Sequence, residues 1–232
     1  KANPEPHGQL PWRRLLMLAA GVMSVGLTSQ YKAPTASAAL ILLAVFLVWL
    51  TFRRDQASGT KLFPSHALSL FAPVGLAYWS YFLISITYTT LLIFAPLFLQ
   101  ELHNVTPILL GYLSLVFSTG WTIGSIAVAG LTGMRERTGS VAGMVFAAAT
   151  TVAFTFAILS GTITMITIWI TLVGFGIGVT NVLMTNYGMS VAREGEEGIT
   201  AAAMPTIRAL GVAFGAATAG LVANSAGLDE GT

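Results

Sequence analysis

Residues 94–139 read FAPLFLQELHNVTPILLGYLSLVFSTGWTIGSIAVAGLTGMRERTG, and this stretch holds the pattern that decides the fold. An apolar run ends at the polar turn QELHNVTP, a second apolar run extends from Ile108 to Gly130, and a basic turn, MRERTG, follows it. An α-helix needs about 20 largely apolar residues to cross the hydrocarbon core of a bilayer. The stretch therefore predicts two neighbouring transmembrane helices joined by a short polar turn.

The composition of the whole chain agrees with this prediction. Of its 232 residues 55% are hydrophobic and only 9% are charged, and the mean hydropathy is +0.77. Soluble domains carry about 25% charged residues. We therefore expect an all-α polytopic membrane protein with about seven transmembrane helices. The predicted spans are Trp12–Gln30, Ala36–Phe52, Val74–Phe98, Ile108–Gly130, Ser140–Ser160, Ile163–Tyr187 and Ile199–Ala223.

The basic residues predict the orientation of these spans, because cytoplasmic loops retain lysine and arginine. With spans in this order, one side of the membrane has Lys32 alone. The other side has Arg13, Arg14, Arg53, Arg54, Lys61, Arg135, Arg137 and Arg193. We therefore expect a cytoplasmic N-terminus and an external C-terminus in a multi-pass protein of the plasma (inner) membrane.

The same pattern divides the chain into five parts. We expect a cytoplasmic segment at 1–11, a two-helix hairpin at 12–53, a cytoplasmic or interfacial linker at 54–73, a helical bundle at 74–223 and an external tail at 224–232. The chain begins with Lys1 rather than methionine and has an odd number of predicted spans, so we expect it to be a fragment.

Several classes of function are disfavoured by the composition. The chain has no cysteine, and its three histidines, at positions 7, 66 and 103, lie outside the predicted spans, so we expect no metal site and no cofactor. The spans lack the paired carboxylates or activated nucleophile that an intramembrane enzyme needs. The net charge of +2 and the pI near 9.1 are typical of basic inside loops and predict no nucleic-acid partner.

Small residues recur at intervals of four in three of the predicted spans. Membrane helices associate by close packing of such residues. The predicted packing positions are Gly120 and Gly124, Gly174 and Gly178, and Gly211 and Gly215 with Ala219.

The quoted stretch resembles the start of the C-terminal half of a major facilitator superfamily transporter, and is most similar to the fourteen-span drug/proton antiporter branch. Three further features fit that branch: the hairpin from Trp12 to Phe52, the linker KLFPSHALSLF, and IRALGVAFG, which is similar to an Arg-x-x-Gly-x-x-x-Gly helix. The resemblance implies that the hairpin is the additional pair of spans between two six-helix halves. It also implies that five helices of the second half follow, with the last helix and the whole N-terminal half missing.

The loop GLTGMRERTG resembles a degenerate copy of the superfamily motif Gly-x-Leu-Ala-Asp-Arg-x-Gly-Arg-Arg, with Gly130 and Arg135 at matching positions. Met134 stands where the motif has aspartate. This departure weakens the case for a gating salt bridge, and a solvated basic turn is the alternative.

Polar side chains follow one face of two predicted spans. The resemblance implies that these two helices line a central cavity, where phenol, amide and hydroxyl groups would contact an amphipathic substrate. Hydrogen bonds between helices, typically worth about 0.6 kcal/mol in membranes, are the other role open to them. The candidates are Tyr81, Ser85 and Tyr88 in the third span and Asn181, Thr185 and Asn186 in the sixth.

Arg208 is the one charged residue well inside a predicted span, about nine residues or 13 Å from its cytoplasmic end. Pro205 precedes it by almost one turn and removes a backbone donor, which predicts a local kink. We interpret the pair as an anchor and hinge, and a direct substrate contact stays open.

A seven-helix receptor or a retinal protein has the same number of spans but does not fit the pattern. A seven-helix receptor has an external N-terminus, and a retinal protein needs a lysine in its last span, where this chain has Arg208. A secondary transporter accounts for the loop charges, the glycines and the polar stripe. We therefore expect efflux of small amphipathic molecules in exchange for protons by alternating access, with the bilayer and the missing half as partners. A facilitator-type metabolite transporter and a non-transporting scaffold are the alternatives.

Overall fold

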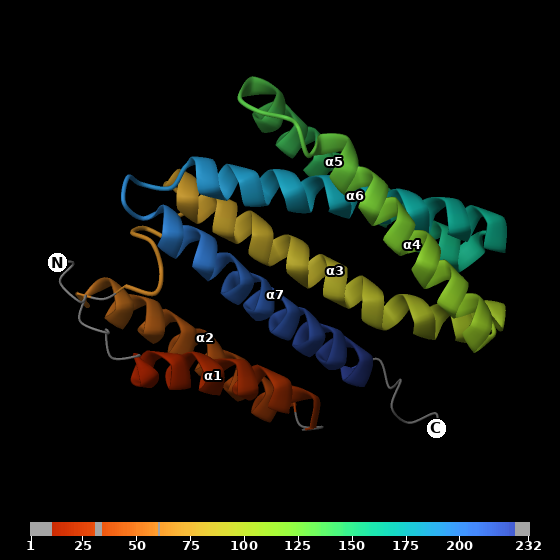
Figure 1. Cartoon of the computed structure of the whole chain (residues 1–232). Helices are drawn as coiled ribbons and strands as arrows, with labels where there is room; N and C mark the ends of the chain where they lie inside the picture. Colours follow the sequence, from red (N-terminus) through yellow and green to blue (C-terminus); the bar gives the residue numbers. More distant parts are fainter. Residues whose placement is uncertain (1–10, 31–33, 60, 226–232) are drawn as a thin grey trace.

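The structure is a computed structural model that describes residues 11–30, 34–59 and 61–225 (Figure 1). Within them the chain forms seven α-helices, one short 3₁₀ helix and no strand. Residues 1–10 of the predicted segment 1–11, most of the predicted tail 224–232, and Lys32 lie outside the described residues. The elements are α1 (Trp12–Gly26), η1 (Leu27–Gln30), α2 (Pro34–Gln56), α3 (Pro73–His103), α4 (Pro107–Val128), α5 (Met134–Ser160), α6 (Ile163–Ser190) and α7 (Glu197–Ser225).

Helices α2 to α7 of the described chain are each long and apolar enough to cross a membrane. The prediction of an all-α membrane protein with about seven helices is confirmed. The first predicted span differs in detail, because α1 has only 15 residues and the segment 27–30 winds more tightly as η1. At this point Thr28 Oγ1 donates to the carbonyl of Val25 at 2.7 Å. Such local bonds compete with the α-helical pattern and favour a tighter last turn.

The turn between α3 and α4 shows why the quoted stretch makes two helices. Asn104 takes a left-handed conformation with φ of 49°, which ends α3. Thr106 then caps α4, since its side chain accepts from the amide of Leu109 at 3.4 Å, and Pro107 begins the helix where no backbone donor is needed.

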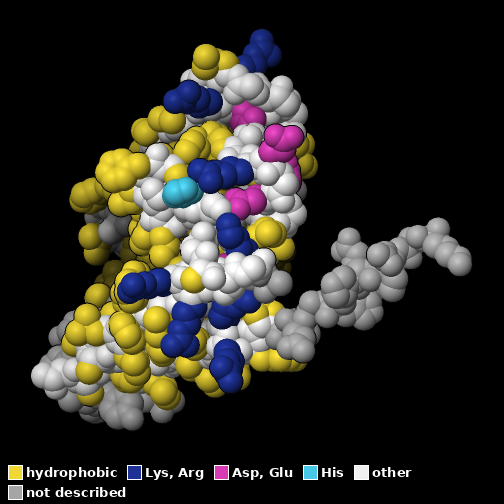
Figure 2. Space-filling model, turned by 90° about the vertical axis from the view of Figure 1, so that its left-hand side faces the viewer, with side chains coloured by type: hydrophobic (Ala, Val, Ile, Leu, Met, Phe, Trp, Pro, Cys, Tyr) yellow, Lys and Arg dark blue, Asp and Glu magenta, His cyan; other side chains and the backbone are white. Residues whose placement is uncertain are grey.

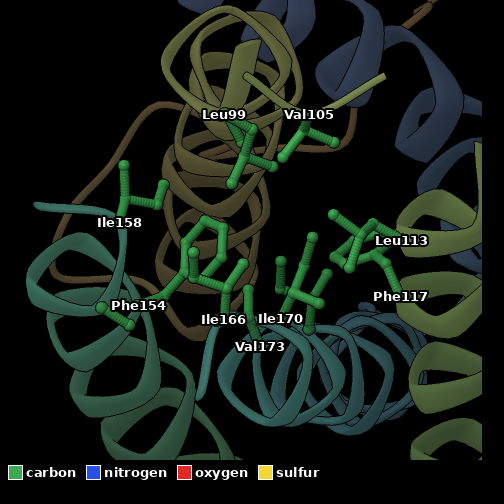
Figure 3. Close-up of a cluster of buried hydrophobic side chains, with 12 residues drawn as sticks. Leu99, Val105, Leu113, Phe117, Phe154, Ile158, Ile166, Ile170 and Val173 are labelled. Carbon is green, nitrogen blue, oxygen red and sulfur yellow. The ribbon is translucent and has the colours of Figure 1, made fainter. Parts of the chain in front are cut away.

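The helices pack in pairs, with α6 against α4 and α5, α3 against α7, and α1 against α2 (Figure 1). One apolar core lies where α3, α4, α5 and α6 meet beside the α3–α4 turn (Figure 3). A second core lies toward the opposite end and joins α2, the following loop, α3, α6 and α7. The side chains labelled in the first core are Leu99, Val105, Leu113, Phe117, Phe154, Ile158, Ile166, Ile170 and Val173.

Candidate functional site

A polar contact joins α3 to α6 at the second core, to which Tyr81 belongs. The side-chain amide of Asn181 donates to the hydroxyl of Tyr81 at 3.5 Å, and the Tyr81 side chain is buried. One turn further along α6, Thr185 Oγ1 donates to the carbonyl of Asn181 at 2.8 Å. Asn186 is half-buried beside them. The structure thus brings Tyr81 of α3 together with Asn181 of α6, and Thr185 extends this polar line along α6.

The remaining residues of the α3 stripe contact other helices. Ser85 is buried and donates to the carbonyl of Tyr81 at 2.7 Å. A Cβ placed on Gly211 would lie 2.6 Å from Ser85 Cβ, so Ser85 is at the contact with α7. Tyr88 instead stacks on Phe117 of α4 and meets the edge of Trp121, with ring centroids 6.1 and 5.2 Å apart. Tyr81, Ser85 and Tyr88 therefore face three different neighbouring helices.

The two predicted glycine pairs of α4 and α6 lie directly against each other's backbone. A Cβ on Gly120 would lie 2.2 Å from the carbonyl oxygen of Thr171, and one on Gly124 would lie 2.2 Å from that of Phe175. In the reverse direction, a Cβ on Gly174 or Gly178 would lie 2.2 Å from a carbonyl oxygen of α4. The helices approach so closely that no side chain fits at these four positions.

Glycines of α7 make a similar but looser contact with α3. A Cβ on Gly211 would lie 2.6 Å from the carbonyl oxygen of Phe82, and one on Gly215 would lie 2.9 Å from that of Ile86. Ala219 is also buried at this level. The small residues of α7 thus place its backbone against α3.

Arg208 and Pro205 lie on the exposed side of α7, away from this contact. The helix continues on both sides of Pro205. Arg208 makes no ion pair or hydrogen bond with the described residues. The Arg208 side chain therefore lies on the exposed face of α7, where it can contact a partner outside the described residues.

The α4–α5 turn holds the two motif-like residues. Gly130 is exposed, and a Cβ added to it would meet nothing within 4 Å. Arg135 is exposed at the start of α5 and forms no ion pair within the described chain. The backbone of this turn depends instead on Gly133, which has φ of 62°.

Sequence reasoning missed a buried carboxylate, Asp55, at the end of α2. Its side chain has no exposed surface, contacts the guanidinium of Arg14, and accepts from the backbone amides of Leu62 and Phe63 at 2.9 to 3.0 Å. The usable signal was an arginine at the start of one hairpin helix and a carboxylate at the end of the other. An antiparallel hairpin brings those two positions together.

A second carboxylate, Glu196, was also missed. It accepts from the amide of Ser65 at 2.9 Å and from its hydroxyl at 2.6 Å, and it pairs with Lys61 at 3.5 Å. These hydrogen bonds from Ser65, followed by the Lys61 charge, hold the pKa of Glu196 below its ordinary value. Asp55 and Glu196 together connect the loop after α2, whose described residues are 57–59 and 61–72, to α2 on one side and to the α6–α7 loop on the other.

Long apolar helices, backbone contact at glycines and polar groups between helices define a multi-pass α-helical membrane protein. The sequence model of the Major Facilitator Superfamily matches residues 15–216. The chain belongs to the Major Facilitator Superfamily, a family of membrane transporters.

Two curated relatives, both named "Probable multidrug-efflux transporter", come from two strains of Mycobacterium tuberculosis. Each is 33% identical to this chain over 233 residues, and the match covers 93% of this chain and 46% of the relative. The chain thus spans about half the length of the curated relatives it matches. No solved structure matches the chain.

Proposed function

We propose that this chain forms the C-terminal part of a proton-coupled efflux transporter for small amphipathic molecules, which works by alternating access. In this proposal α1 and α2 are the additional hairpin, and α3 to α7 are five helices of the C-terminal six-helix bundle. Family membership, the name of the relatives and their twofold greater length support it.

The observation that carries the proposal is the polar contact between Tyr81 and Asn181, because it joins two separate transmembrane helices. About two turns further along α3, Tyr88 forms an aromatic group with Phe117 and Trp121 of α4. Aromatic faces bind the rings of an amphipathic molecule, and amide or phenol groups orient its polar part. We assign substrate contact to Tyr81, Tyr88, Asn181, Thr185 and Asn186, and close packing to Ser85.

The test uses the longer polypeptide that includes an N-terminal half. Asn181→Ala and Tyr88→Ala should each lower efflux of a fluorescent amphipathic cation several-fold at equal expression. Thr87→Val is the matched control, because Thr87 is exposed on the same helix and its hydroxyl bonds only to Leu83 within that helix. Equal loss in the control would contradict substrate contact at Asn181 and Tyr88.

Two further measurements separate the alternatives. Collapse of the proton gradient should stop export, and unchanged flux would favour a facilitator. The 232-residue chain alone, reconstituted in liposomes, should not transport. The reason is that, in this proposal, the N-terminal half of the transporter supplies part of the substrate path. Proton-dependent flux by this chain alone would overturn the half-transporter assignment.

We assign Arg208 the role of an anchor, in keeping with its exposed position on α7. A long cationic side chain in an apolar helix extends toward the interface or a polar partner. Arg208→Lys should therefore keep most of the transport, whereas Arg208→Ala should lower it for chemically unrelated substrates alike. Selective loss for anionic substrates would show direct contact with cargo instead.

A further inference from the structure

An apolar pocket of about 400 Å³ lies between the hairpin and the rest of the bundle. Its walls come from α2, the loop after α2, α3 and α7, and among them are Val48, Trp49, Phe82, Leu210 and Phe214. Pockets of this size hold small organic ligands. The three helices are each long and apolar enough to cross a membrane, and a bilayer around them would bring lipid chains to the pocket.

A second, polar pocket of about 420 Å³ adjoins the first. The two share four lining residues, which are Trp49, Phe52, Ala67 and Leu68. The polar pocket is also lined by Arg53, Gln56, Ser65, His66, Ser69 and Arg193. It lies at the end of the molecule where lysine and arginine side chains gather (Figure 2). The combined cavity is therefore apolar at one end and basic at the other.

The two arginines of this cavity keep their charge available. Two carboxylates beside the cavity are already engaged, Asp55 by Arg14 and Glu196 by Lys61 and Ser65. The exposed Glu194, next to Arg193 in the sequence, forms no ion pair with the described residues. Arg53 lies over the ring of Trp49, with 5.2 Å from its guanidinium carbon to the ring centroid. Neither Arg53 nor Arg193 takes part in an ion pair with the described residues. An anion bound in this cavity would therefore give both arginines a partner of opposite charge.

We propose that this cavity binds an anionic phospholipid from the leaflet at the basic end of the molecule. One acyl chain fills the apolar pocket, and the headgroup phosphate lies between Arg53 and Arg193. Clusters of basic residues at the ends of membrane helices attract anionic lipid headgroups. The apolar pocket explains why the occupant is a lipid rather than a soluble anion. The inference is independent of the proposed transport function.

The headgroup is tested with the 232-residue chain in lipid nanodiscs, by native mass spectrometry of bound phosphatidylglycerol and phosphatidylcholine. Arg53→Gln and Arg193→Gln should each weaken phosphatidylglycerol binding about fivefold, the effect of one basic residue near a membrane surface. Arg54→Gln is the matched control, because Arg54 is exposed beside Arg53 but does not line either pocket. Equal effects of all three substitutions, or equal binding of the two lipids, would overturn the proposal.

Separate experiments test where the acyl chain binds and whether the phosphate belongs to a lipid or to a free anion. Thr218→Phe adds a ring to the wall of the apolar pocket at an exposed position and should reduce phosphatidylglycerol binding without unfolding the chain. Inorganic phosphate at millimolar concentration should not displace the lipid. In the longer polypeptide, a photoreactive group at residue 218 should crosslink to lipid. Displacement by phosphate, an unaffected Thr218→Phe variant or a crosslink to another protein segment would each refute the site.

Discussion

Asp55 and Glu196 are two carboxylates with long-range partners, and they differ in their exposure to water. The Asp55 side chain is fully buried, whereas 17% of the Glu196 side chain is exposed. A buried charge is stable only when it is paired and hydrogen-bonded, because its removal from water is costly. Each carboxylate accepts backbone amides from the loop after α2, so single side chains fix the course of that loop.

Asp55→Asn should destabilise the chain by about 3–5 kcal/mol, the usual cost of removing one partner from a buried ion pair. The substitution keeps the shape of the side chain but removes the charge that contacts Arg14. It also turns an amide group toward the backbone donors of Leu62 and Phe63. Unfolding in a detergent titration, followed by tryptophan fluorescence, measures the effect. Arg13→Gln, at an exposed neighbouring position, should change little.

Glu196 predicts a pH dependence. Its pKa in the folded chain lies below the ordinary value of 4.5, so its charge stabilises the fold fully above about pH 4.5. That contribution is lost as the pH falls through the lowered pKa. Hydrogen exchange of segment 61–66, corrected for the intrinsic rate, should therefore accelerate in this acidic range. Glu196→Gln should show fast exchange already at neutral pH, while the exposed Glu194→Gln should behave as the parent chain.

At the scale of the helix, the contact of α4 with α6 depends on the absence of side chains. Gly178→Ala should cost about 1–3 kcal/mol, because its Cβ would lie 2.2 Å from the carbonyl oxygen of Trp121 and the helices must separate. Gly111→Ala on α4 is the control, since a Cβ there meets nothing within 4 Å. Thermal unfolding in detergent compares the two. Helix propensity favours alanine over glycine at both positions, so a similar loss in both variants would mean that the close contact does not set the effect.

The helices themselves follow from the sequence, because apolar runs bounded by polar turns are visible without structural knowledge. The spacing of Gly174 and Gly178 likewise indicates a close helix contact, although not which helix is the partner. The contact of Ser85 with α7 is not predictable, because the spacing of residues shows which face of α3 it lies on but not which helix packs against that face. The bonds from Glu196 to Ser65 join residues 131 positions apart, so no local pattern reveals them.

For the whole molecule, the distribution of charge predicts the orientation in the membrane. The chain has no cysteine, so single cysteines can be introduced on a clean background. Cysteine at Thr138, beside the basic α4–α5 turn, should be shielded from an impermeant external thiol reagent in intact cells, and cysteine at Asn104 should react. Asn104 lies in the turn between α3 and α4, and Thr138 lies in the first turns of α5, so α4 separates the two positions. The reverse labelling pattern would invert the topology.

The backbone contact between α4 and α6 also has an evolutionary consequence. Every missense change at Gly120, Gly124, Gly174 or Gly178 adds at least one carbon atom at a point where a carbonyl oxygen stands 2.2 Å away. These codons therefore have no conservative replacement, in contrast to exposed positions of α4 such as Leu115, where valine, isoleucine or methionine serve. Two glycine pairs, each four residues apart, therefore leave this helix contact little room for neutral drift.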